Sequence, residues 1–179
     1  LIADYTEADD IIAHVVQSDY YDGWNKIIVS SDKDFFQLCD DDVSVYRPIQ
    51  KKTLNKQSIL EEFQIHPKNF ALARAIVGDK SDNLPGVKGA GLKTVAKRFP
   101  YLIREDVYDV SDIMRDCAMQ GKKMKIHENI GNSEQLVKDN YKIMQLYYPN
   151  IRPINRAMID KSIKDFEPFF SKIKFTQML

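Results

Sequence analysis

Alternating apolar and polar residues divide the chain into a first part of mixed helix and strand and a second part of helices. In "ADDIIAHVV", apolar residues recur at spacings of three and four from Ala8 to Val16, which is typical of one face of a helix. The apolar run "KIIVS" predicts a short buried strand, and "VSVYRPI" predicts a second strand that Pro48 limits. A helix followed by strands in this order favours an α/β layer.

Beyond residue 50 the pattern becomes helical. Pro67 is placed to open a helix through "KNFALARAIV", and Gly78 is placed to end it. The stretch "LPGVKGAGLKTVAKRF" is a glycine-punctuated turn that leads into another amphipathic helix. We therefore expect an α/β core over residues 1–50 and a helical region over residues 51–179, with the turn at about 83–98.

The formal net charge of zero, from 26 acidic and 26 basic residues among 179, conceals an uneven distribution. Residues 1–50 carry 11 acidic and 3 basic residues, whereas residues 51–100 carry 4 acidic and 10 basic residues. An acidic segment joined to a basic one fits a metal site beside a surface that binds a polyanion, and it equally fits an ordinary solvated surface.

Cys39 and Cys117 lack metal-ligand spacing, and two thiols in a chain of this size suit a reducing, cytoplasmic compartment. No apolar run approaches membrane-spanning length, and no signal-peptide pattern is present, so we expect no membrane association. The chain begins at Leu1 rather than Met and enters a motif at once, which favours a fragment or a processed piece.

Three small groups of carboxylates lie at the ends of predicted elements, in "TEADD", "SSDKDF" and "GDKSDN". Each group has an ordinary structural explanation. Acids in a first helical turn meet the positive end of the helix dipole, acids after a strand can cap the next helix, and Asp and Asn commonly satisfy their own backbone in turns. On extended backbone, however, Asp32 and Asp34 would share a face at the carboxyl end of a strand, where α/β folds place their sites.

Convergence of the three groups on one spot would explain why a chain gathers charges that repel one another. Clustered carboxylates oppose ionisation of one another unless a cation is present. Ligation by oxygen alone, without His or Cys, selects a hard ion such as Mg²⁺ or Mn²⁺. Two such ions about 4 Å apart are a common device for phosphodiester cleavage.

The glycine-rich turn "GVKGAGLKT" suggests a nucleic-acid partner. Glycine lets a backbone approach phosphate closely, and the helix that follows presents free N–H groups. Nearby lysines would neutralise phosphate, and nothing in the turn reads base edges, so binding should follow backbone and shape. A helix–helix connection with surface lysines is the alternative. The candidate DNA-binding residues are Gly86, Val87, Lys88, Gly89, Gly91, Lys93, Thr94 and Lys97.

The motifs "EADDIIA", "SSDKDFFQL" and "GDKSDNLPGVKGAGLKTVAKRF", in this order and spacing, resemble the 5′-nuclease (flap endonuclease) family over about residues 4–100. "SSDKDFFQL" followed by "VYRPIQKK" is most similar to the T-even phage ribonuclease H group. The resemblance implies a PIN-like core with a partial parallel sheet, followed by a helix–hairpin–helix region. It also implies that the family's first strand, amino-terminal aspartates and helical arch should precede Glu7; this sequence lacks them.

The resemblance also implies roles for individual residues. Glu7 and Asp9 match metal ligands, Asp10 matches an adjacent acid, and Asp32, Asp34 and Asp79 match ligands of a second ion with Asp82 nearby. The implied catalytic residues are Glu7, Asp9, Asp32, Asp34 and Asp79, and the implied metal-binding set adds Asp10 and Asp82. Because the family's turn often holds K⁺ through carbonyl groups, Leu84 and Val87 are candidates for that ion.

The function so implied is metal-dependent cleavage of 5′ flaps, nicked duplexes or RNA primers on DNA during phage replication. Duplex DNA would be the partner of a monomeric protein in the host cytoplasm, and the aromatic, basic stretch "FEPFFSKIKF" could contact a replication protein such as a single-strand-binding protein or clamp. The same stretch also fits a final helix with its Phe residues packed inward. Two other functions stay open: a non-catalytic, structure-selective DNA-binding fragment, and a different metallonuclease of the same sheet topology.

Overall fold

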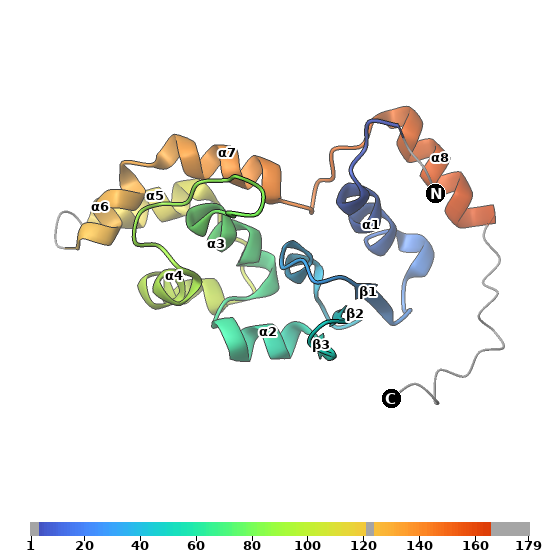
Figure 1. Ribbon diagram of the computed structural model, residues 1–179, viewed down its shortest axis with the longest axis horizontal. Helices are drawn as coiled ribbons and strands as arrows, with labels where there is room; N and C mark the ends of the chain where they lie inside the picture. Colours follow the sequence, from blue (N-terminus) through green and yellow to red (C-terminus); the bar gives the residue numbers. More distant parts are fainter. Residues whose placement is uncertain (1–3, 121–123, 166–179) are drawn as a thin grey trace.

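The computed structural model describes residues 4–120 and 124–165, which form a small mixed sheet at one edge of a mainly helical molecule (Figure 1). The sheet order is β1-β2-β3, and its strands are Lys26–Val29, Val43–Arg47 and Lys52–Leu54. The α-helices are α1 (Ala8–Val16), α2 (Lys56–Phe63), α3 (Phe70–Val77), α4 (Leu92–Arg98), α5 (Val110–Gln120), α6 (Lys125–Gly131), α7 (Glu134–Met144) and α8 (Pro153–Asp165). The expected α/β class is confirmed.

Strands β1 and β2 pair in parallel, with Ile28 opposite Val45, as the two predicted strands required. Strand β3 pairs antiparallel with β2 and places Leu54 opposite Val45. Strand β3 therefore lies beyond residue 50, in a polar segment that was expected to belong to the helical region. Strand β1 forms one edge of this sheet, where Ile27 and Val29 expose 61% and 67% of their surface.

Short 3₁₀ helices connect the sheet to the helical region. They are η1 (Asp19–Tyr21), η2 (Asp34–Leu38), η3 (Pro67–Asn69) and η4 (Pro100–Ile103). Pro67 opens η3, which runs directly into α3, and Gly78 ends α3 with a φ of 74°, so the predicted start and stop of this helix are confirmed. A positive φ at this position is favourable because glycine has no Cβ.

One hydrophobic core runs from the sheet into the helical region and fixes the segments that carry the candidate site. Phe36 of η2, Phe63 of α2 and Phe70 of α3 pack with ring centroids 5.3–5.8 Å apart. The buried amide of Gln37 donates to the carbonyls of Asp34 and Met144, and its oxygen accepts from the Leu146 N–H. These contacts hold η2 between α3 and the end of α7.

A smaller apolar cluster joins the two helices that lie beside each other at one side of the molecule, α1 and α8 (Figure 1). Ile151, Ile159 and Ile163 are buried there against Ile11 and Val15. His14 of α1 and Asp160 of α8 add a contact of 2.7 Å between Nε2 and Oδ1. The α1 helix, which carries the first acidic group, is therefore held by a segment some 150 residues further along the chain.

Candidate metal-binding active site

The first acidic group lies at the start of α1. Glu7 occupies the N-cap position with extended backbone, and Asp9 and Asp10 lie in the first turn. Burial raises the pKa of Asp9, and the nearby carboxylates of Asp32, Glu7, Asp10 and Asp82 raise it further. Asp9 thus lies within electrostatic reach of acids from two other segments of the chain, which is the predicted convergence.

The second group follows strand β1, but its backbone is not extended as expected. Asp34 begins the helix η2, and the Asp34 N–H donates to Oδ1 of Asp32 at 2.8 Å. The Asp32 N–H donates to the Ser30 hydroxyl at 3.1 Å. The N-cap residue of η2 is Lys33, and Asp32 forms a turn in which its side chain satisfies the Asp34 N–H at the start of that helix. The second oxygen of Asp32 stays available for another partner.

The third group lies in the loop after α3, where Asp79 is held by other groups of the protein. Its Oδ1 accepts from the Ser81 N–H and hydroxyl, and its Oδ2 accepts from the guanidinium of Arg74. The hydrogen bond from the Ser81 hydroxyl, followed by that from Arg74, lowers the pKa of Asp79 to about 2. Asp79 is thus an ionised carboxylate whose oxygens are both engaged in hydrogen bonds.

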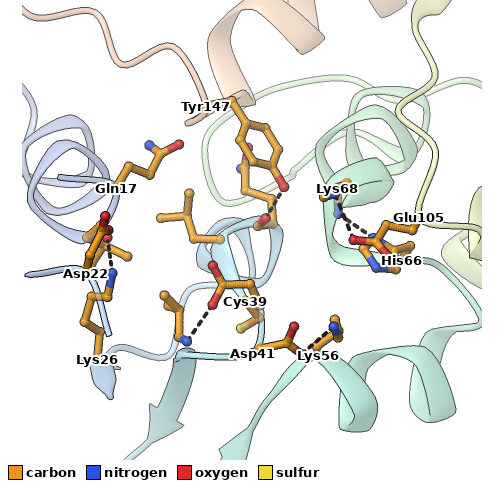
Figure 2. A pocket seen from close by; sticks show the side chains of 15 residues that line it. Gln17, Asp22, Lys26, Cys39, Asp41, Lys56, His66, Lys68, Glu105 and Tyr147 are labelled. Atoms are coloured by element: carbon orange, nitrogen blue, oxygen red, sulfur yellow. Dashed lines mark hydrogen bonds and ion pairs between the residues drawn. The ribbon is translucent and has the colours of Figure 1, made fainter. Parts of the chain in front are cut away.

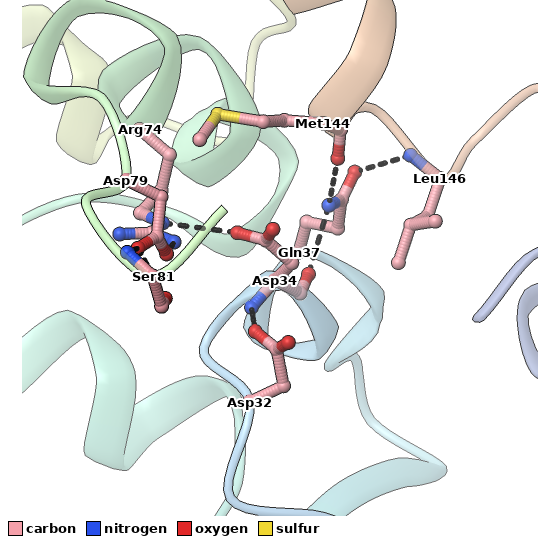
Figure 3. Close-up of polar contacts among 8 residues, drawn as sticks. All are labelled: Asp32, Asp34, Gln37, Arg74, Asp79, Ser81, Met144 and Leu146. Carbon is pink, nitrogen blue, oxygen red and sulfur yellow. Dashed lines mark hydrogen bonds and ion pairs between the residues drawn. The ribbon is translucent and has the colours of Figure 1, made fainter. Parts of the chain in front are cut away.

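Arg74 links the second and third groups, as Figure 3 shows. Its Nε donates to Oδ1 of Asp34 at 2.9 Å while Nη2 donates to Asp79. The arginine is 7% exposed, and a buried guanidinium needs such partners. Burial raises the pKa of Asp34, and the Arg74 charge opposes this rise. The sequence analysis did not identify Arg74, although a single charge within the apolar run "FALARAIV" was an available signal.

Six of the seven predicted metal-binding residues line one open cavity of about 910 Å³, which also borders α7. Asp79 is the exception: it faces Arg74 and is absent from the lining. Lys142 and Asp139 contribute further charge, and Tyr5 and Asn150 also line the cavity. The six predicted residues that line the cavity are Glu7, Asp9, Asp10, Asp32, Asp34 and Asp82.

Within residues 4–120 and 124–165, no three His, Cys, Asp or Glu side chains are grouped tightly enough to form a metal site. The cavity nevertheless suits a hard divalent ion, since its donors are carboxylates; burial, and then repulsion among these carboxylates, raises the pKa of Asp9. A cation would remove that repulsion. The acidic residues could therefore hold a divalent ion, while Arg74 supplies part of the compensating charge.

A second cavity, of about 410 Å³, lies at the opposite ends of the strands, beside the first residues of β1 and β2 (Figure 2). Its charged side chains neutralise one another: Lys56 pairs with Asp41, and Lys68 pairs with Glu105 at 3.0 Å. This balance contrasts with the acidic excess of the first cavity. The carboxyl ends of the strands, where α/β folds place their sites, thus carry the stronger candidate.

The glycine-rich segment joins α3 to α4 and exposes Lys88, while the other two predicted basic side chains, Lys93 and Lys97, are exposed on α4 itself. Gly89 has a φ of 84°, and an added Cβ would meet only the Ile126 side chain at 3.9 Å; no atom lies within 4 Å of such a Cβ at Gly91. Both glycines leave the backbone open to a ligand. Thr94 is partly buried on α4.

Two candidates in this segment have structural roles that the sequence analysis did not anticipate. A Cβ on Gly86 would lie 1.7 Å from the Val77 carbonyl oxygen, so this glycine permits close packing of the loop on α3 rather than approach to phosphate. Val87 is 4% exposed, and its N–H donates to the Ile76 carbonyl at 2.9 Å. The carbonyls of Leu84 and Val87, the candidates for K⁺, already accept from the N–H groups of Asp79 and Ala90.

Comparison with known proteins identifies similar nucleases. The family model described as "5′-3′ exonuclease, N-terminal resolvase-like domain" matches residues 1–64. A 5′-3′ exonuclease of Aquifex aeolicus (strain VF5) is 38% identical over 88 residues, covering 49% of this chain and 30% of the relative. Flap endonuclease Xni of Pseudoalteromonas translucida (strain TAC 125) is 33% identical over 135 residues, covering 73% of this chain and 51% of the relative.

These matches support a 5′-nuclease family for the chain. The chain spans about half the length of the flap endonuclease from Pseudoalteromonas translucida and under a third of the length of the exonuclease from Aquifex aeolicus. The fold of the chain is also found in T5 5′-exonuclease with bound divalent metal ions (zinc), with a TM-score of 0.73 and 24% identity over 89% of this chain and 59% of that one. A bacteriophage T5 flap endonuclease complex with DNA and metal ions gives a TM-score of 0.74 at the same identity and coverage.

The remaining expectations concern the ends of the chain and the membrane. The stretch "FEPFFSKIKF" lies outside the described residues, so its contact with a replication protein stays a prediction. No helix among the residues that the structure describes is long and apolar enough to cross a membrane. Cys39 and Cys117 are buried free thiols.

Proposed function

We propose that the complete protein is a metal-dependent 5′-nuclease that hydrolyses phosphodiesters as a flap endonuclease or 5′-3′ exonuclease. The observation that carries the proposal is the cavity into which α1, the loop after β1 and the loop after α3 all direct carboxylates. The substrates would be DNA or RNA–DNA with a 5′ flap or an RNA primer, in phage replication and in the host cytoplasm. A monomer suffices for this arrangement.

Two Mg²⁺ or Mn²⁺ ions would activate the attacking water and stabilise the leaving 3′ oxygen. Glu7 and Asp9 are the candidates for one ion, with Asp10 beside them, and Asp32 and Asp34 are the candidates for the other. Asp82 lies at the edge of the same cavity. Asp79 would act either as a ligand released from Arg74 or as the anchor that keeps Arg74 on Asp34.

The loop at about residues 83–98 would grip duplex DNA as a helix–hairpin–helix element. Lys88, Lys93 and Lys97 are exposed and would neutralise phosphate, while Gly89 and Gly91 leave the backbone accessible. A K⁺ ion held by Leu84 and Val87 carbonyls would strengthen this grip, because each carbonyl keeps a second lone pair. Gly86 supports the loop from behind, so its contribution to DNA binding would be indirect.

A non-catalytic, structure-selective DNA-binding function is the second candidate for the chain as it stands. The engagement of Asp34 and Asp79 by Arg74 favours it, since fewer free carboxylate oxygens remain for an ion. In that case the lysine-bearing loop would bind DNA without cleavage.

The deciding experiment measures cleavage of a 5′-flap duplex in Mg²⁺, by residues 1–179 alone and after addition of the family's amino-terminal segment in trans. The proposal predicts cleavage on addition of that segment and its loss in Asp32→Asn. The matched control Asp112→Asn changes an acid on α5, outside the cavity, and should cleave normally. DNA binding with no cleavage under any of these conditions would favour the second candidate.

A further inference from the structure

Tyr5 is an aromatic side chain at the border of the acidic cavity. It is 87% exposed, and it lines the same cavity as the carboxylates of α1 and of the loop after β1. The guanidinium carbon of Arg152 lies 4.9 Å from the centre of its ring. A ring with a cation on one face and high exposure has its other face available for stacking by a planar group.

The turn that presents Tyr5 is fixed by a buried side chain. Tyr5 has a φ of 58°, a backbone conformation that is uncommon for a residue other than glycine. Asn155 of α8, 7% exposed, donates to the Asp4 carbonyl and to the Thr6 hydroxyl, both at 2.8 Å. The amide of Asn155 thus holds the residues on both sides of Tyr5. The apolar cluster between α1 and α8 in turn fixes the position of the helix that carries Asn155.

The segment before α8 contributes a further contact to the cavity. The Asn150 N–H donates to Oδ1 of Asp10 at 3.0 Å, and Arg152 follows two residues later. The segment between α7 and α8 therefore places the cation Arg152 against the Tyr5 ring, which precedes α1, beside a cavity that is mostly acidic. Phosphate would be repelled by the carboxylates but attracted by Arg152, whereas an uncharged base can stack on the ring.

We propose that Tyr5 and Arg152 form a stacking site for an unpaired nucleobase of single-stranded nucleic acid at the border of the cleavage cavity. The inference rests on the proposed function and deepens it, because it assigns the part of the substrate that this border holds. Every base has a π face, so such a site favours unpaired over paired nucleotides without reading sequence. Arg152 would contact the adjacent phosphate.

The test compares binding of two DNA duplexes, one with a short 5′ flap carrying 2-aminopurine at the junction and one without a flap, in the absence of divalent ions. Stacking on the ring would quench 2-aminopurine fluorescence, so the readout is independent of cleavage. Tyr5→Ala should weaken flap binding about tenfold and abolish the quenching, and should leave binding of the flap-free duplex unchanged. Tyr5→Phe should retain both properties.

Tyr148→Ala is the matched control, because Tyr148 is 84% exposed and lies outside the cavity lining. Its flap binding should equal that of the wild type. If Tyr5→Ala binds and quenches the flap like the wild type, the stacking site is refuted while the nuclease proposal stands. Equal weakening for both duplexes would also refute it, as that would indicate a general loss of the fold. A wild-type chain that binds neither duplex would overturn the inference and the proposed function together.

Discussion

Replacement of Arg74 by methionine tests the link between the two acidic loops. The guanidinium is 7% exposed and donates to Asp34 and Asp79, whose side chains are 15% and 17% exposed. Methionine fills a similar volume in the apolar helix α3 but leaves two neighbouring carboxylates without their cation. Removal of one partner from a buried ion pair costs about 3–5 kcal/mol, and the partial exposure of both carboxylates favours the lower end, about 3 kcal/mol.

Urea unfolding followed by circular dichroism at neutral pH measures this loss of unfolding free energy. With a slope of about 2 kcal/mol per molar urea, a loss of about 3 kcal/mol lowers the midpoint by about 1.5 M. Arg115→Met is the matched control, because Arg115 is 63% exposed in a surface pair with Asp112 and should lose no more than about 0.5 kcal/mol. Similar losses for Arg74→Met and Arg115→Met would refute the buried ion-pair network.

The same variant separates a purely structural role of Arg74 from competition with a metal ion. Without the guanidinium, the oxygens of Asp34 and Asp79 become available to Mg²⁺, which binds the folded chain and raises its unfolding free energy. Added Mg²⁺ should therefore shift the midpoint of Arg74→Met more than that of the wild type. An equal shift in both proteins would contradict competition between Arg74 and the ion.

Three further outcomes follow from the site and its surroundings. Asp32→Asn should abolish flap cleavage by the complete protein but retain duplex binding, measured by gel shift; near-normal turnover would exclude Asp32 from the metal site. Lys88→Ala combined with Lys93→Ala should reduce the log–log salt slope of duplex binding by up to about two units, and an unchanged slope would show that neither lysine contacts phosphate. Burial lowers the pKa of His66 below its usual 6.5, so the unfolded chain takes up the proton first and stability should fall as pH drops below 6.5. His66→Asn, whose amide oxygen can still accept from the Lys68 N–H, should flatten that decline in urea midpoints; an identical pH profile would contradict it.

Local sequence patterns predicted the elements whose boundaries are set by nearby residues. The strand in "KIIVS" forms as predicted, but only Ile28 is buried, because β1 is an edge strand whose Ile27 and Val29 are exposed. Helix α3 begins after Pro67 and ends at Gly78 as proline and glycine geometry require. Strand β3 was missed because "KTL" is short and polar. Its position depends on pairing with β2, a contact that no local pattern contains.

The convergence of the acids was predictable, while their local geometry was not. Carboxylates at element boundaries indicated a shared site, and the cavity brings six of them together. Asp32 and Asp34 were expected on extended backbone, but the free N–H groups at the start of η2 favour a capping turn there. The engagement of Asp79 depends on Arg74, whose role becomes visible only when α3 packs against η2.

Contacts between distant segments account for what the sequence could not show. Asn155 holds the turn at Tyr5, and Gln37 joins η2 to the end of α7, each across more than 100 residues. The role of Gly86 likewise depends on the approach of its backbone to Val77, which glycine spacing alone does not distinguish from approach to phosphate.

Binding of Mn²⁺ to residues 1–179, followed by titration calorimetry, tests most directly whether acids from separate segments form one divalent-ion site. The account predicts weak, saturable binding that is reduced by Asp9→Asn on α1 and by Asp32→Asn after β1. The variant that combines both substitutions should lose no more Mn²⁺-binding free energy than the two single variants lose together, because both carboxylates serve a shared site. The control Asp112→Asn should bind as the wild type does. Binding that is unaffected by either single variant, or affected by Asp112→Asn to the same extent, would contradict the shared site.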